Sequence, residues 1–166
     1  MDTGMLLARV VLGLLMAAHG AQKLFGWFGG YGLAGTGGFF ESLGFRPGRL
    51  FAAAAGSTEL AGGLLVAAGL LGPLGPALIL ATMIVAIVTV HLPNGVFAQN
   101  NGLELPLLYL VAAAVLALTG FGAYSLDAAL ELTWSPEVVY ATLGLGALGG
   151  VANLAIRKTN PAEARV

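Results

Sequence analysis

The sequence predicts an all-α membrane protein, a four-helix transmembrane bundle followed by a fifth C-terminal transmembrane helix. Of its 166 residues, 58% are hydrophobic and only 9% are charged, whereas soluble domains carry about 25% charged residues. Five stretches approach the roughly 20 apolar residues that a transmembrane helix needs. They cover about residues 5–23, 50–71, 74–92, 104–121 and 137–156. We expect the first stretch to be an uncleaved span, because no basic region precedes it.

Proline and glycine separate these stretches, as expected for residues that cannot continue a helix. The separators are Pro47-Gly48, residues 72–76, Pro93-Asn94-Gly95, residues 120–122 and Ser135-Pro136. The last pair suits a helix start, since serine is a capping residue and proline fits the first turn. Inside the spans, small residues recur four apart, at Ala52/Gly56, Ala113/Ala117 and Gly146/Gly150. We interpret them as close contacts within the bundle.

Residues 1–130 form the predicted bundle, and residues 131–166 form an extension that holds the fifth span. Between the first two spans, residues of about 24–49 are rich in glycine and aromatic side chains. Aromatic rings prefer the membrane interface, so we expect this interfacial loop to hold a short amphipathic helix over about 37–44. It is placed to fold over a pocket as a lid.

Lysine and arginine predict the orientation in the cell membrane. With five spans, the first loop, the third loop and the C-terminus share one side, which holds Lys23, Arg46, Arg49, Arg157, Lys158 and Arg165. The other side has no lysine or arginine near the span ends. The positive-inside rule therefore predicts an external N-terminus and a cytoplasmic C-terminus.

Six ionisable residues lie inside or beside the apolar stretches, namely Arg9, His19, Lys23, Glu59, His91 and Glu104. A charge in the hydrocarbon core costs roughly 2.5–3.5 kcal/mol on insertion scales, so such residues usually face a polar pocket. In an up-down bundle, all of them except Arg9 fall at the same membrane face. The sequence therefore predicts an intramembrane polar pocket in one leaflet.

Each of these residues also has a structural interpretation. Lys23 can reach the headgroups with its long side chain, and Arg9 can pair with Glu59 to lock the bundle. The two histidines can serve as hydrogen-bonding residues, and Glu104 suits the first turn of a helix. As a group, these side chains can relay protons, bind a quinone headgroup or bind a metal. No His-x-x-His or Glu-x-x-His pair supports the metal, so no metal site is predicted.

Composition excludes several other functions. Cysteine is absent, which removes disulfide chemistry, thiolate nucleophiles and cysteine-held iron–sulfur clusters. The formal net charge of −1 offers no basic patch for nucleic acid. The expected partner is the lipid bilayer, and no intrinsic cofactor is predicted.

Several segments resemble the DoxX family over about residues 5–130. They are Ala18-His19-Gly20-Ala21-Gln22-Lys23-Leu24-Phe25-Gly26, residues 39–45, Glu59 with residues 60–65, and residues 120–127. This family comprises small integral membrane proteins of bacteria and archaea, usually with a four-helix core, that are commonly described as membrane oxidoreductases. On the resemblance, His19, Lys23, Glu59 and Glu104 occupy its recurrent polar positions. The fifth span departs from the four-helix pattern.

Two hypotheses follow. In the first, the protein is a membrane oxidoreductase component that binds a quinone or passes protons, with electrons supplied by substrate or a redox partner subunit. Glu59 then accepts or delivers the proton, and His19 and Lys23 polarise a quinone oxygen. The ligand site also includes Arg9, Trp27, His91 and Glu104. In the second, it is a non-enzymatic membrane scaffold or small-solute carrier whose polar cluster fixes the bundle or binds a solute.

Overall fold

The computed structural model describes residues 2–158, which form helices and connecting loops without any strand. The long helices are α1 (Asp2–Phe25), α3 (Gly48–Ala68), α4 (Leu74–Ala86), α5 (Glu104–Thr119) and α7 (Pro136–Ala155). The short elements are η1 (Trp27–Gly29), α2 (Gly32–Ser42), η3 (Leu92–Asn94), η4 (Ala98–Asn100) and α6 (Leu126–Ala129). A π-helix, η2 (Ile87–His91), continues α4. The predicted all-α fold is confirmed.

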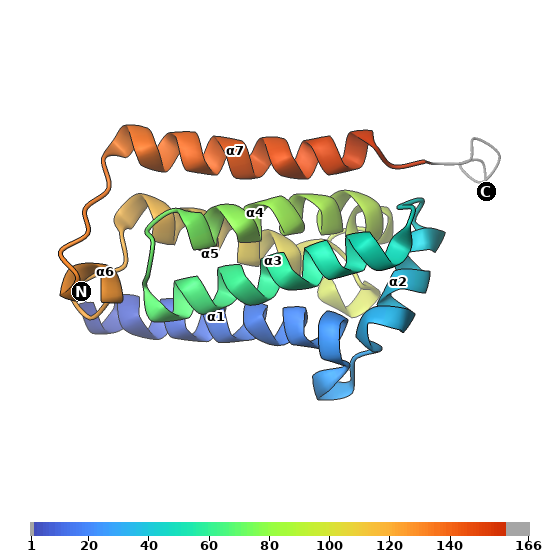
Figure 1. Cartoon of the computed structure of the whole chain (residues 1–166), viewed down its shortest axis with the longest axis horizontal. Coiled ribbons are helices and arrows are strands. Elements are labelled where there is room, and N and C mark those ends of the chain that lie inside the picture. The colour runs from blue at the N-terminus through green and yellow to red at the C-terminus, as the bar shows by residue number, and fades with distance from the viewer. Residues whose placement is uncertain (1, 159–166) are drawn as a thin grey trace.

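The long helices form an up-down bundle (Figure 1). α1, α4 and α7 run in one direction, and α3 and α5 return in the other. We call the end that carries α2 the lid end, and the opposite end, with residues 69–73 and α6, the turn end. The N-terminus lies at the turn end, and α7 runs toward the lid end, as the alternating direction of five long helices requires.

Four helices are long and apolar enough to cross a membrane, at Asp2–Phe25, Gly48–Ala68, Leu74–Asn94 and Pro136–Ala155. They make the chain a multi-pass membrane protein. The fourth predicted stretch is a shorter apolar helix, because α5 has 16 residues and ends at Thr119. At 1.5 Å per residue it is about 24 Å long, less than the roughly 30 Å of a typical hydrocarbon core.

Glycine allows the helices to touch backbone to backbone. A Cβ at Gly63 would lie 2.4 Å from the Ala17 amide nitrogen, and one at Gly13 would lie 2.4 Å from that of Ala67. These positions join α1 to α3. The predicted bundle contact at Gly146/Gly150 is confirmed, since their Cβ atoms would lie 2.4 Å and 2.8 Å from carbonyl oxygens of α4. The hydrophobic core between the packed helices consists of Leu12, Met16, Val66, Ile79, Leu80, Met83, Ala113, Leu116 and Phe121.

At the lid end, α2 is tied to the end of α7. The Arg157 Nε donates to the Leu43 carbonyl, and the Lys158 amide donates to the Gly44 carbonyl at 2.9 Å. Gly44 has φ +91°, and a Cβ there would lie 2.5 Å from the Lys158 carbonyl oxygen. The short helix predicted over 37–44 is present but begins earlier, at Gly32. Arg165, one of the cations on which the predicted orientation depends, lies outside the described residues.

Candidate functional site

The centre of the candidate site is an ion pair between α1 and α3. Lys23 Nζ lies 2.5 Å from Glu59 Oε2, and their side chains are 25% and 5% exposed. Gly56, one turn before Glu59, leaves room for this approach, because a Cβ there would lie 3.2 Å from the Lys23 Cβ. Pairing lowers the cost of placing both charges inside a membrane protein. It is the one ion pair among residues 2–158.

Beside this ion pair lies a cavity of about 250 Å³. α3 and α4 touch near the turn that joins them, where a Cβ at Gly62 would lie 3.0 Å from the Leu78 Cβ. Toward the lid end they enclose the cavity, which α2, Lys23 and Asn153 of α7 complete. Its polar side chains are Lys23, Thr58, Glu59, Thr82, Thr89, His91 and Asn153. We call this space the lid-end cavity.

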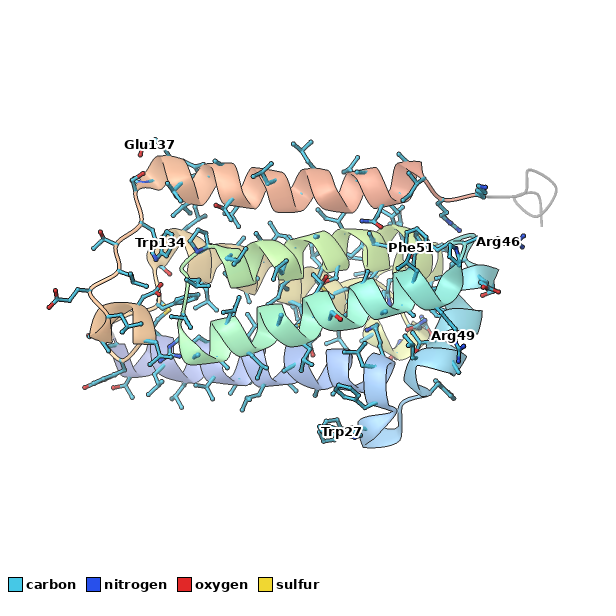
Figure 2. The ribbon with its side chains drawn as sticks, in the orientation of Figure 1. Trp27, Arg46, Arg49, Phe51, Trp134 and Glu137 are labelled. Atoms are coloured by element: carbon cyan, nitrogen blue, oxygen red, sulfur yellow. The ribbon has the colours of Figure 1, made fainter. Side chains whose placement is uncertain are left out.

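An aromatic wall faces these polar groups. It consists of Phe39 and Phe40 of α2, Phe45 of the following loop and Phe51 of α3. The ring centroids of Phe40 and Phe45 are 5.7 Å apart, and those of Phe45 and Phe51 are 5.3 Å apart. Figure 2 shows Phe51 near the lid end of α3. The predicted lid therefore covers a cavity, and it contributes apolar rings that suit a flat, lipophilic ligand.

The π-helix η2 also lines the cavity. Thr89, Val90 and His91 all belong to it and all line the cavity. The wider turn of a π-helix interrupts the regular α-helical spacing, and such turns are frequent at functional sites. His91 Nδ1 is bonded to the carbonyl oxygen of Asn101 at 2.8 Å, which fixes the orientation of the ring.

The structure brings three of the predicted residues, Lys23, Glu59 and His91, to this one cavity. His19 lies outside its lining and packs edge-on against Tyr109, with ring centroids 5.8 Å apart. Glu104 is also outside, where its Oε2 accepts from the Ala98 amide at 2.9 Å. Among the described residues, no three His, Asp or Glu side chains form a group that could hold a metal ion.

Two of the predicted ligand residues are elsewhere. Trp27 is 59% exposed and lies on the side of α1 away from α7 (Figure 2). Its ring packs against that of Phe25, with ring centroids 5.1 Å apart. The expected pair between Arg9 and Glu59 is wrong. Arg9 is 14 positions before Lys23, about 21 Å along the helix, and its guanidinium donates to the carbonyls of Ala67 and Tyr124.

The sequence interpretation missed the three threonines and Asn153. Thr82 and Thr89 are seven residues apart, which places them on one face of the third span. Together with His91, they are the polar side chains of an otherwise apolar stretch. Asn153 is the single amide side chain in the fifth span. These uncharged polar residues are visible in the sequence as intramembrane polar positions, but the predicted site consisted of ionisable residues and Trp27.

The comparisons with known proteins identify the family. The family model that matches, over residues 4–92, is that of DoxX. A protein of Bacillus subtilis (strain 168) named "Putative oxidoreductase CatD" is 36% identical over 126 residues, which cover 76% of this chain and 86% of that protein. No solved structure gives a significant match. The chain, a helical multi-pass membrane protein, belongs to the DoxX family.

Proposed function

We propose that this protein is a membrane oxidoreductase component that binds a quinone-class ring in the lid-end cavity. The name of the Bacillus relative supports the class of activity. The observation that carries the proposal is the cavity, in which the Lys23–Glu59 pair and His91 face the rings of Phe39, Phe40, Phe45 and Phe51. A quinone has a flat apolar ring with polar oxygens at its edge, and this lining matches both parts.

In this proposal Lys23 and Glu59 have different roles at the edge of the ring. The Lys23 ammonium has three N–H donors. One of them bonds Glu59, so another can donate to a ring oxygen. Glu59 is positioned to accept or deliver a proton beside that oxygen. In the proposal, electrons pass between the ring and either a substrate or a redox partner subunit, and the chain has no cysteine that could hold an iron–sulfur cluster of its own.

The test is ring binding by the purified protein in lipid nanodiscs, measured by native mass spectrometry and by titration with ubiquinone-1 and ubiquinol-1. We expect wild type to bind at least one of these two forms. Glu59→Gln removes the charge that holds Lys23 in place, so it should weaken binding about tenfold or more. Glu104→Gln is the matched control, since this carboxylate is at the same end but outside the cavity.

Three outcomes are informative. Loss of binding in Glu59→Gln alone, with all proteins folded and monodisperse, supports the proposal. Equal loss in Glu104→Gln contradicts the assignment to this cavity. Wild type that binds neither form contradicts the proposal and favours the alternative, a non-enzymatic scaffold or small-solute carrier.

We further propose that the protein resides in the cell membrane with its N-terminus outside and its C-terminus in the cytoplasm. The cations Arg46, Arg49, Arg157 and Lys158 support this orientation, because hydrogen bonds join residues 157–158 to residues 43–44 at the lid end. Alkaline phosphatase is active only outside the cytoplasm. A fusion at the C-terminus should be inactive, and an active fusion would reverse the orientation.

A further inference from the structure

We infer that the lid-end cavity selects the hydroxyl-bearing form of its ring, the hydroquinone, over the carbonyl form, the quinone. The inference rests on the proposed function and names the state of the ligand that this site prefers. It follows from the hydrogen-bonding capacity that the polar side chains of the cavity still have after their own bonds within the protein.

The three threonines have already donated their hydroxyl hydrogens. Thr58 donates to the Ala54 carbonyl at 2.7 Å, Thr82 to that of Ile79 at 3.0 Å and Thr89 to that of Val85 at 2.8 Å. A carbonyl oxygen can only accept and a hydroxyl has one hydrogen, so the threonine must be the donor in each bond. What remains for a ligand in the cavity is the hydroxyl oxygen as an acceptor.

His91 presents the same polarity. Its Nδ1 is 2.8 Å from the Asn101 carbonyl oxygen, so the hydrogen of that bond belongs to Nδ1. In the neutral imidazole the other ring nitrogen, Nε2, then has no hydrogen and is an acceptor. The bond to the backbone thus sets both the orientation of the ring and the polarity of its free nitrogen.

Only two of the polar side chains can still donate. Lys23 has N–H groups beyond the one that it gives to Glu59, and Asn153 has one beyond the N–H that it gives to the Gly149 carbonyl at 3.1 Å. The carboxylate of Glu59 accepts only. With Glu59 ionised and His91 neutral, five of the seven polar side chains in the cavity are therefore acceptors alone, namely those of Thr58, Glu59, Thr82, Thr89 and His91.

A quinone does not complement this lining. Its two carbonyl oxygens are acceptors, and they leave the protein acceptors unpaired when the ring displaces water. A hydroquinone has two O–H groups, and each can accept from Lys23 or Asn153 while it donates to a threonine, Glu59 or His91. Sites built to hydrogen-bond a ligand discriminate strongly against an analogue that lacks the matching group, so we expect a preference of about tenfold or more.

The decisive measurement compares ubiquinone-1 with ubiquinol-1 on the full chain in nanodiscs under anaerobic conditions. We expect the dissociation constant of ubiquinol-1 to be about tenfold lower. A preference of that size raises the midpoint potential of the bound two-electron couple by about 30 mV. Equal affinity, or tighter binding of ubiquinone-1, overturns the inference while leaving the proposed function intact. Binding of neither form overturns the proposed function.

Threonine-to-valine variants test the cause of the preference. Thr82→Val and Thr89→Val keep the side-chain shape and remove the acceptor, and each original hydroxyl bonds within its own helix, so the fold should tolerate both. They should weaken ubiquinol-1 binding several-fold and leave ubiquinone-1 unchanged. Thr119→Val is the matched control, because Thr119 also bonds its own helix, at 2.8 Å to Val115, and lies outside the cavity. Equal weakening of both forms in the cavity variants overturns the inference.

Discussion

Arg9 and Lys23 lie on the same helix and face the interior of the same bundle, yet their surroundings differ. Arg9 is 3% exposed, and its guanidinium donates to the carbonyls of Ala67 and Tyr124. Lys23 is 25% exposed, pairs with a carboxylate and borders a cavity. A cation inside a membrane helix is therefore not sufficient to indicate a binding site. The distinction depends on whether the cation borders a cavity that a ligand can enter, because Arg9 is buried among backbone carbonyls even though its Nε has no partner.

The rest of the turn end repeats the pattern of Arg9. Asp127 is 6% exposed and accepts from the amides of Leu71 at 2.8 Å and Gly72 at 2.7 Å, and from Trp134 Nε1 at 2.9 Å. These bonds join the α3–α4 turn to the segment that leads into α7. The charges of the turn end thus hold segments together, whereas the Lys23–Glu59 pair at the lid end borders a cavity.

The largest effect on stability should come from Arg9→Met. It removes two charge-assisted hydrogen bonds to partly buried carbonyls, so the free energy of unfolding should fall by about 3 kcal/mol. The measurement is unfolding by sodium dodecyl sulfate in mixed micelles, with exposed Arg46→Met as control. Ring binding by the folded fraction should stay at the wild-type level. A stable Arg9→Met protein that had lost ring binding would contradict the purely structural role of Arg9.

Asp127→Asn should have an intermediate effect. Asparagine has one acceptor oxygen and no charge, so it cannot satisfy all three donors, and we expect a loss of about 2 kcal/mol. The same unfolding assay measures the loss, and Trp134 fluorescence reports directly on the broken contact. Glu131→Gln, at an exposed position, provides the control. Unchanged stability and fluorescence would show that this carboxylate does not hold the turn end.

The smallest effect on stability should come from the ion pair that matters most for the ligand. A double-mutant cycle of Lys23→Met and Glu59→Gln should give a coupling energy below about 1 kcal/mol, because Lys23 is partly exposed. The same two variants should lose ring binding. A coupling energy as large as the effect of Arg9→Met would instead make the pair structural and remove the contrast between the two ends.

Much of the fold could be predicted because hydrophobic length and helix-breaking residues are local signals. Four of the five predicted spans, the lid helix and the contact at Gly146/Gly150 follow from them. The grouping of Lys23, Glu59 and His91 followed from chain direction alone, since an up-down bundle places those positions at one end. Chain direction does not determine which way each side chain points at that end. His19 and Glu104 were therefore predicted inside the site.

Other features depend on contacts far apart in the sequence. Arg9 bonds carbonyls 58 and 115 positions away, and no local pattern distinguishes a carbonyl from a carboxylate partner. The π-helix of Ile87–His91 is likewise invisible to helical periodicity, which assumes a regular turn, although it turns Thr89 and His91 to the cavity. Trp27 was assigned to the ligand by its aromatic character, but an aromatic ring suits the membrane interface equally well.

The 16 residues of α5 have a consequence for the lipids around the protein. The helix is about 6 Å shorter than a typical hydrocarbon core, so the bilayer beside it must thin, or the flanking residues must reach outward. Hydrophobic mismatch of this kind costs fractions of a kcal/mol per Å and sorts proteins among membranes of different thickness. The lipid annulus is therefore uneven around this bundle, with short-chain lipids favoured along α5 and longer chains along α7.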